Sequence, residues 1–281
     1  MKETEKLSLE EINKLKDLSC KIRCHILTIV KDAAVGHIGG SLSVTDILTA
    51  LYFKVLNIDP KNPDWDGRDR LILSKGHGAA AIYSTLAERG FFPAGQLKTF
   101  GNIDSNFQVH PDRTKVPGIE ASTGALGQGL SVAAGMALAA RLDGKDYHTF
   151  AILGDGETQE GQIWEAAMFS AHYKLDNLTA VLDYNNVQLM GNVSDIMEVA
   201  PVDDKWKSFG WNVIKIEGHD FRQIIESLDS AKEYKGRPTI IIADTVKGKG
   251  VSFMQNSCTW HGNVPSEEEY DQAIKELKSN Q

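Results

Sequence analysis

The chain has 281 residues, of which 42% are hydrophobic and 24% are charged, and its formal net charge is −8. This balance is ordinary for a globular chain with a buried core. An acidic chain without a Lys/Arg-dense stretch is unsuited to nucleic acid or to a membrane surface. No apolar run approaches the roughly 20 residues that a membrane-spanning helix needs.

The N-terminal segment and the cysteines indicate a cytoplasmic protein. Residues 1–11 carry charges of both signs and no apolar core, so we expect no secretory signal. Cys20, Cys24 and Cys258 are an odd number of cysteines without metal-binding spacing. We therefore expect buried free thiols in a reducing compartment.

The first third of the chain predicts helices around a glycine-rich turn. Ser8 and Glu11 form a capping box, and apolar residues follow at helical spacing to about Lys31. Residues 36–40 then form the turn, and a second helix is expected from Ser43 to about Val55.

Short apolar runs that alternate with helical patterns predict the rest of the fold. We expect strands at 71–73, 149–153, 178–183, 212–216 and 239–243, and helices at 79–89, 130–142, 162–173 and 221–233. Residues 100–118 are expected to form an ordered loop, and Ser266 with Glu269 caps a last helix. The alternation predicts a doubly wound, mainly parallel α/β sheet with helices on both faces, in a single domain over residues 1–281.

The most informative motif follows the strand that ends at Leu153. Gly154-Asp155-Gly156 comes directly after it, and Asn185 follows the next strand. Ligands of parallel sheets bind at the carboxyl ends of strands, so Asp155 and Asn185 are expected to converge. Their hard oxygens suit Mg²⁺, which also takes phosphate and water ligands. The two glycines allow a tight turn whose N–H groups face an anion, so the motif predicts a Mg²⁺-bridged diphosphate.

These residues resemble the thiamine diphosphate motif, and the longer run 154–161 with Trp164-Glu165-Ala166 resembles the version in transketolases. Further blocks agree in order along nearly the whole chain; they are Gly36-His37, residues 68–70 with 73–77, His110-Pro111, residues 123–129, and residues 247–250 with His261-Gly262. The resemblance is to the N-terminal, cofactor-binding part of the transketolase family.

The resemblance implies a cofactor site of thiamine diphosphate and Mg²⁺. Asp155, Asn185 and the carbonyl of Val187 are implied as metal ligands. The cofactor-binding residues are implied to be Gly154 and Gly156 with His77 and His261 near the diphosphate, Gly124 and Leu126 near the two rings, and Glu165.

It also implies that His37, His110 and His261 face the sugar. Glu160 and Glu165 resemble acids at the subunit contact that relay toward the glutamate by which the partner activates the cofactor. His25, His148, His172 and His219 lie outside the matched blocks and are expected to be structural. Ile38 and Ala125 stand where many relatives have proline, which puts the shape of the substrate mouth, and so the sugar, in question.

The resemblance further implies a split enzyme. Full-length transketolases carry a second cofactor-binding domain and a C-terminal domain, and we expect a separate C-terminal subunit to supply these, in a two-fold heterotetramer. The implied reaction is two-carbon ketol transfer between sugar phosphates, as in the pentose phosphate pathway.

Other functions remain open at the level of sequence. The chain could be a related deoxysugar phosphate synthase, a transketolase for an unusual pentose, or a non-catalytic module that keeps the fold. A nicotinamide-binding protein is disfavoured, because the glycines at 124, 127 and 129 follow a polar loop and not a strand.

Overall fold

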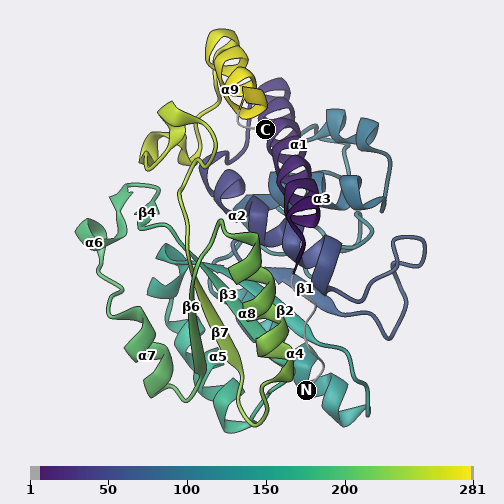
Figure 1. Ribbon diagram of the computed structural model, residues 1–281, viewed down its shortest axis with the longest axis vertical. Coiled ribbons are helices and arrows are strands. Elements are labelled where there is room, and N and C mark those ends of the chain that lie inside the picture. The colour runs from purple at the N-terminus through teal and green to yellow at the C-terminus, as the bar shows by residue number, and fades with distance from the viewer. Residues whose placement is uncertain (1–6, 280–281) are drawn as a thin grey trace.

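The computed structural model describes residues 7–279 and contains one five-stranded parallel sheet (Figure 1). The strands run in the order β1-β2-β3-β7-β6, and every neighbouring pair is parallel. Their bounds are β1 Arg70–Leu73, β2 Thr149–Gly154, β3 Leu178–Tyr184, β6 Asn212–Glu217 and β7 Thr239–Asp244. The predicted parallel sheet is confirmed. The expectation of no secretory signal falls partly on residues 1–6, outside the described residues.

Helices connect the strands and cover both faces of the sheet. Their bounds are α1 Leu9–Ala33, α2 Gly39–Ala50, α3 Ala79–Arg89, α4 Gln128–Leu142, α5 Gly161–His172, α6 Val193–Ile196, α7 Val202–Ser208, α8 Phe221–Glu233 and α9 Glu267–Ser279. A short hairpin, β4 (Val187–Gln188) and β5 (Gly191–Asn192), follows β3. Residues 100–118 contain no helix or strand, as expected.

Alternate residues of the buried strands pack into two separate apolar layers. On β2, Phe150 and Ile152 contact the layer that includes α1, α2, α3 and α8, whereas Ala151 and Leu153 contact the layer of α4, α5 and α7. Ile241 on β7 lies in the first layer and Ile242 in the second. Both faces are apolar because strand residues alternate between faces and helices cover each side.

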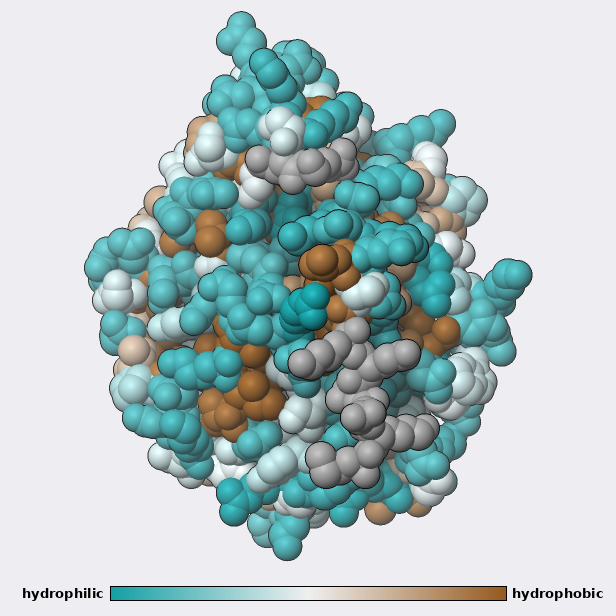
Figure 2. Space-filling view, viewed as in Figure 1, coloured by the Kyte–Doolittle hydropathy of each residue, from teal (hydrophilic) through white to brown (hydrophobic). Residues whose placement is uncertain are grey.

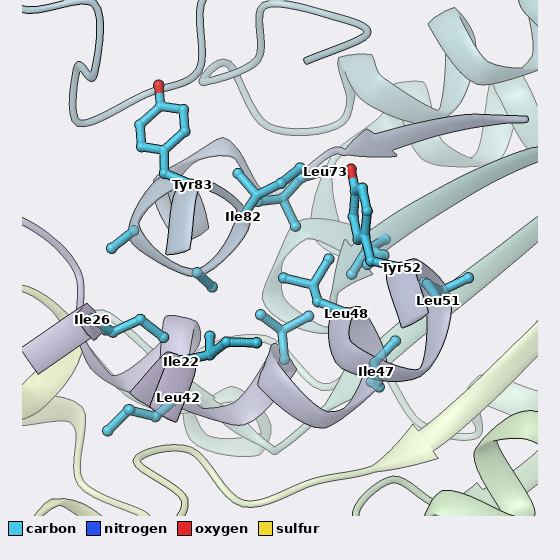
Figure 3. Packing of buried hydrophobic residues seen from close by; sticks show 14 of the residues in the cluster. Ile22, Ile26, Leu42, Ile47, Leu48, Leu51, Tyr52, Leu73, Ile82 and Tyr83 are labelled. Carbon is cyan, nitrogen blue, oxygen red and sulfur yellow. The ribbon is translucent and has the colours of Figure 1, made fainter. Parts of the chain in front are cut away.

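The first layer is centred on α1, α2 and α3. Figure 3 shows Ile22, Leu48 and Ile82, one from each helix, pointing into the same core, and all three are almost completely buried. The capping box that begins α1 is present, with Glu11 N donating to Ser8 Oγ at 3.2 Å and Ser8 N donating to Glu11 Oε2 at 3.0 Å. The predicted cap of α9 is present as well.

The second helix differs from its prediction. It begins at Gly39, not at Ser43, and its α-helical part ends at Ala50, where a π-helical turn, Leu51–Val55, continues it. All twelve residues of α2 are buried, so no polar face marks where the helix begins.

The visible surface is mostly hydrophilic (Figure 2), with an apolar area in the lower left of the view, where Figure 1 draws β6 and β7. Within residues 7–279, no helix has the length and apolar character to span a bilayer. The expectation for the thiols is only partly correct: Cys20 is buried, but Cys24 and Cys258 are half-buried, and no disulfide joins the three.

Candidate active site

Four loops that leave the carboxyl edge of the sheet enclose a pocket of about 250 Å³. They follow β1, β2, β3 and β7, and the segment around His261 adds a further wall. The lining comprises Gly40, Lys75, His77, Leu126, Gly154, Asp155, Gly156, Glu157, Gln159, Glu160, Asn185, Val187, Gln188, Leu189, Lys247 and His261. Because the strands are parallel, residues distant in sequence meet at this edge.

Asp155 lies at the base of the pocket and is buried. Its Oδ2 accepts hydrogen bonds from the backbone N–H groups of Asn185 and Asn186, and its Oδ1 accepts one from Gly156. Burial and the neighbouring Asp183 carboxylate raise the pKa of Asp155 to about 6, against the effect of these hydrogen bonds. A carboxylate that is hard to ionise alone is well suited to a bound cation.

Asn185 and Val187 lie beside Asp155, as the sequence predicted. Asn185 Oδ1 accepts a hydrogen bond from Val187 N at 3.1 Å, and Val187 O accepts one from Lys247 Nζ at 2.9 Å. Of the three predicted ligands, Asp155 thus lies at the end of β2, and Asn185 and Val187 lie in the turn after β3. Among the described residues, no cluster of three or more His, Cys, Asp or Glu side chains could hold a metal alone.

One expectation for the glycine turn is wrong. The N–H of Gly154 is not available to a bound diphosphate, because the Glu157 carboxylate accepts its hydrogen bond at 3.0 Å. Glu157 also accepts hydrogen bonds from Gly127 N and from the Ser74 hydroxyl, so it joins three loops beneath the pocket. The Gly156 N–H is likewise occupied, by Asp155 at 2.7 Å.

The four histidines that the sequence singled out gather on one side of the pocket. Ring centroids lie 5.3 Å apart for His37 and His77, 5.4 Å for His37 and His261, 5.1 Å for His77 and His261, and 6.0 Å for His37 and His110. Burial, followed by nearby lysines and histidines, lowers the pKa of His261 to about 3 and that of His77 well below its ordinary value. These rings are neutral near pH 7.

His37 holds an unsatisfied atom within this cluster. Its Nδ1 is buried and has no hydrogen-bond partner among the described residues. Burial, with His110 and Lys247 nearby, lowers the pKa of His37. A buried polar atom without a partner costs about 1–3 kcal/mol, so the position of His37 is one that the histidine cluster holds at the expense of stability.

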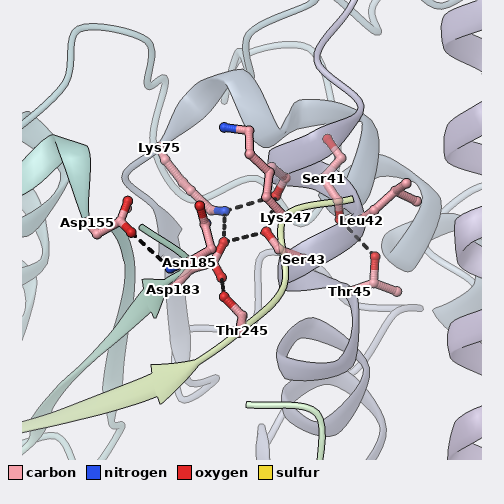
Figure 4. A network of polar contacts seen from close by, with 12 residues as sticks. Ser41, Leu42, Ser43, Thr45, Lys75, Asp155, Asp183, Asn185, Thr245 and Lys247 are labelled. Atoms are coloured by element: carbon pink, nitrogen blue, oxygen red, sulfur yellow. Dashed lines mark hydrogen bonds and ion pairs between the residues drawn. The ribbon is translucent and has the colours of Figure 1, made fainter. Parts of the chain in front are cut away.

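A buried ion pair stabilises the edge of the sheet beneath the pocket. Figure 4 shows Lys75, Ser43 and Thr245 pointing toward Asp183 at the end of β3, and each bonds its carboxylate. Burial alone raises the pKa of Asp183, but Lys75 and the two hydroxyls outweigh burial and hold that pKa below its ordinary value. The charge of Lys75 is therefore already compensated within the protein.

Lys247 is a second buried lysine and has no carboxylate partner among residues 7–279. It is only 2% exposed, and its Nζ lies 2.9 Å from both His261 Nδ1 and Val187 O. Burial and the charge of Lys75 lower the pKa of Lys247 to about 8. An uncompensated buried cation favours an anionic ligand in this part of the pocket.

The remaining predicted residues divide between the pocket and its rim. Gly124 packs against His110, since a Cβ at Gly124 would lie 3.3 Å from that ring. Leu126 and Glu160 line the pocket and are exposed. Glu165 lies outside the pocket on the exposed side of α5, so a direct cofactor contact within this chain is not formed.

The two positions where many relatives have proline, Ile38 and Ala125, differ in their burial. Ala125 is exposed near the pocket rim, whereas Ile38 is completely buried in the core and acts on the mouth only through its backbone.

Several residues of the site had no role in the sequence interpretation. Lys75 and Lys247 lie within the matched blocks, and Glu157 directly follows the glycine motif, but their burial and bonding come from the fold. Gln188, which bonds Gln159 at 3.0 Å in the pocket wall, lies in a segment without periodic signal. The sequence signal that could have identified Lys75, Lys247 and Glu157 is their position next to glycine-rich turns.

The fold and the site define an α/β protein whose parallel sheet presents a polar pocket with a buried lysine and two histidines at its carboxyl edge, where ligands of this class of fold bind. Residues 15–280 match the family model of the transketolase thiamine diphosphate-binding domain. The chain therefore belongs to the transketolase family. The helix after Gly127 follows a loop and not a strand, so the nicotinamide alternative is excluded.

Relatives of two lengths match the chain. A 6-deoxy-6-sulfo-D-fructose transketolase subunit of Clostridium sp. (strain MSTE9) is 44% identical, and the match covers 97% of this chain and 93% of that protein. An apulose-4-phosphate transketolase subunit of Phocaeicola vulgatus is 43% identical, with 95% of each covered. The transketolase structure from Leishmania mexicana matches with a TM-score of 0.89 and 30% identity over 94% of this chain, but the chain spans only 41% of it.

Proposed function

We propose that this chain is the N-terminal subunit of a split transketolase that transfers a two-carbon ketol unit between sugar phosphates in the cytoplasm. It acts as one cofactor-binding domain over residues 1–281 and needs a separate C-terminal subunit. The observation that supports this most is the convergence of Asp155, Asn185, His77 and His261 in one pocket, with His37 and His110 next to it, in a chain with transketolase subunits among its relatives.

The residues present fit thiamine diphosphate with Mg²⁺. Asp155, Asn185 and the Val187 carbonyl offer hard oxygens for the metal, and the phosphates and water supply the other ligands. Lys247 and His77 would hold the diphosphate, and the Val187 carbonyl, which Lys247 contacts here, would be a metal ligand. Gly156 and Gly154 allow close approach of the backbone. When bound, the cofactor supplies the carbanion that attacks a ketose carbonyl.

The histidine cluster handles protons and hydroxyls of the sugar. His261 lines the pocket, and the rings of His37 and His110 lie beside it, with centroids 5.4 Å apart for His37 and His261 and 6.0 Å apart for His37 and His110. Because burial holds His37 and His261 unprotonated near pH 7, each ring has one nitrogen that can accept a hydrogen bond from a hydroxyl. Glu160 and Glu165, both exposed, face the partner and orient its groups.

Exposed apolar side chains at the rim of the pocket are an argument for a partner subunit. Leu189 and Met190 follow the β3 turn and are 58% and 75% exposed, and Leu126 is exposed across the pocket. Side chains of this kind around a polar pocket are typical of a surface that another chain covers. The C-terminal subunit then completes the pocket, in a two-fold heterotetramer.

Replacing the buried carboxylate tests the metal site. Asp155→Ala removes the carboxylate ligand, so we expect Mg²⁺-dependent thiamine diphosphate binding by the assembled enzyme to be lost while the circular dichroism spectrum is kept. Isothermal titration calorimetry with and without Mg²⁺ measures this. Asp17→Ala, an exposed residue of α1, serves as the control. Unchanged binding by Asp155→Ala would show that the metal lies elsewhere.

A coupled assay tests the activity itself. Xylulose 5-phosphate and ribose 5-phosphate with thiamine diphosphate and Mg²⁺ are given to this chain alone and to this chain with a candidate C-terminal subunit. We expect turnover only in the mixture. Full turnover by the single chain would overturn the split-enzyme proposal.

A second candidate is a transketolase for an unusual sugar phosphate. The names of two relatives, for a sulfonated fructose and for apulose 4-phosphate, favour it, and Ala125 at the rim is a further difference. The same assay with those donors distinguishes the two: turnover with them and none with xylulose 5-phosphate supports the specialised enzyme.

A further inference from the structure

Outside the pocket, three buried polar side chains are joined by hydrogen bonds, and the last of them bonds the backbone segment that carries Lys247. Arg23 of α1 donates from Nη1 and Nη2 to the two carboxylate oxygens of Asp46 on α2, at 3.0 and 2.8 Å. His219, in the loop between β6 and α8, places Nδ1 2.7 Å from Asp46 Oδ2. The side chains of Arg23, Asp46 and His219 are 8%, 6% and 7% exposed.

The backbone of Val246 determines the tautomer of His219. Val246 N donates to His219 Nε2 at 2.9 Å, and a backbone amide can only donate. Nε2 is therefore unprotonated, and Nδ1 carries the proton that it donates to Asp46. Burial raises the pKa of Asp46, but Arg23 and His219 together outweigh it, so that this pKa lies well below its ordinary value and the group is a carboxylate.

The segment 245–248 is fastened on both sides of Lys247. Thr245 bonds the Asp183 carboxylate, Val246 bonds His219, and Gly248 N donates to Gly39 O at 3.1 Å. A Cβ at Gly218 would lie 2.5 Å from Thr245 Cγ2, so glycine there lets the loop of His219 pack against this segment. Lys247 stands between these bonds, with Nζ in the pocket.

We propose that His219, oriented by Asp46, is a positioning residue that fixes the backbone of Val246 and so aims the Lys247 ammonium at the cofactor's diphosphate. His219 is not among the residues that line the pocket of Asp155 and Lys247. The proposal rests on the proposed function in one respect, that the anion near Lys247 is a diphosphate. The link from His219 to Val246 is independent of it.

Two substitutions separate the bonds of His219. In His219→Gln the side-chain oxygen reaches the position of Nε2 and accepts the Val246 N–H. In His219→Asn the amide reaches the position of Nδ1, donates to Asp46 and leaves the Val246 N–H without an acceptor. His148→Gln is the matched control, because His148 is as buried but bonds Thr179 at 2.8 Å, at the opposite end of the strands.

The first measurement is amide hydrogen exchange of Val246 in the cofactor-free chain. We expect faster exchange at Val246 in His219→Asn and retained protection in His219→Gln and His148→Gln. Nitrogen NMR of the wild-type imidazole should show the neutral Nδ1–H form. Full protection of Val246 in His219→Asn, or the Nε2–H form in the wild type, overturns the proposal.

The second measurement is the thiamine diphosphate affinity of the assembled enzyme in saturating Mg²⁺. We expect affinity to fall about tenfold in His219→Asn, because the segment of Lys247 is no longer fixed and must be ordered on binding, and to stay within about threefold of wild type in His219→Gln. Equal affinities for the two variants overturn the proposal. A wild type that binds no cofactor contradicts the proposed function instead, and hydrogen exchange still decides the role of His219.

Discussion

At the scale of single residues, burial keeps two histidines neutral in different parts of the chain. The pKa of His148 and that of His261 are both lowered to about 3, first by burial and then by nearby positive charge. His261 faces the pocket, where a neutral ring can take part in proton transfer. The ring of His148 lies at the opposite end of the strands from the pocket, where its Nε2 bonds Thr179, so its effect is on stability.

His148 makes the fold sensitive to acid. An unfolded histidine titrates near 6.5, whereas folded His148 titrates near 3. Above pH 6.5 neither state binds the proton, and the stability is fully present. As the pH falls from 6.5 toward 3, the unfolded state binds a proton that the folded state does not, so stability is lost.

We therefore expect His148→Gln to lose less stability than the wild type over this pH range, by up to roughly 4 kcal/mol. Urea unfolding at a series of pH values measures the difference. Parallel pH profiles for the two proteins would show that folded His148 titrates normally.

At the scale of elements, the sequence predicted strands and most helices because their apolar patterns follow the burial that the fold imposes. It singled out Asp155 and Asn185 because they follow strand ends, and it singled out His37, His77, His110 and His261 because they lie in blocks that resemble the family; the roles of all six stay predictions. It misplaced the start of α2, since a helix buried all round has no amphipathic period. It gave no role to Glu157 or Lys247, because their partners, Gly127 and Val187, come from distant segments.

Two glycines of α4, Gly129 and Gly135, differ in the space that surrounds them. A Cβ at Gly129 would lie 2.5 Å from Ser74 Cβ, whereas a Cβ at Gly135 would meet nothing within 4 Å. Gly129 thus permits the close packing of α4 on the loop after β1, and Gly135 only adds flexibility to the unfolded chain.

We expect Gly135→Ala to raise the free energy of unfolding by about 0.5–1 kcal/mol and Gly129→Ala to lower it by about 1–3 kcal/mol. Chemical denaturation of the two variants measures both. Destabilisation of similar size at both positions would mean that helix flexibility, and not packing on Ser74, explains Gly129.

At the scale of the whole molecule, the pocket is one-sided. The sheet, its loops and the histidines form its base and walls, and an apolar rim around Leu189 and Met190 stays exposed. A polar pocket with such a rim fits a chain that works only against a second surface.

Charge placed on the rim should weaken assembly without unfolding the subunit. We expect Met190→Asp to reduce association with the C-terminal subunit by at least about tenfold, because a carboxylate buried in the contact loses its hydration. Analytical ultracentrifugation of the mixture measures this. Ile103→Asp, at an exposed loop residue outside the pocket lining, is the control. Equal association of both variants with the partner would place the contact elsewhere.

Because the pocket is open on one side, binding of the cofactor and association of the two subunits are expected to be coupled. If each chain builds one wall around the cofactor, the vitamin strengthens pairing by the same factor by which pairing strengthens retention of the vitamin. When thiamine is scarce, unpaired subunits then expose the apolar rim of the pocket to proteases and to other proteins. In such an enzyme the extent of subunit pairing would follow the supply of the vitamin.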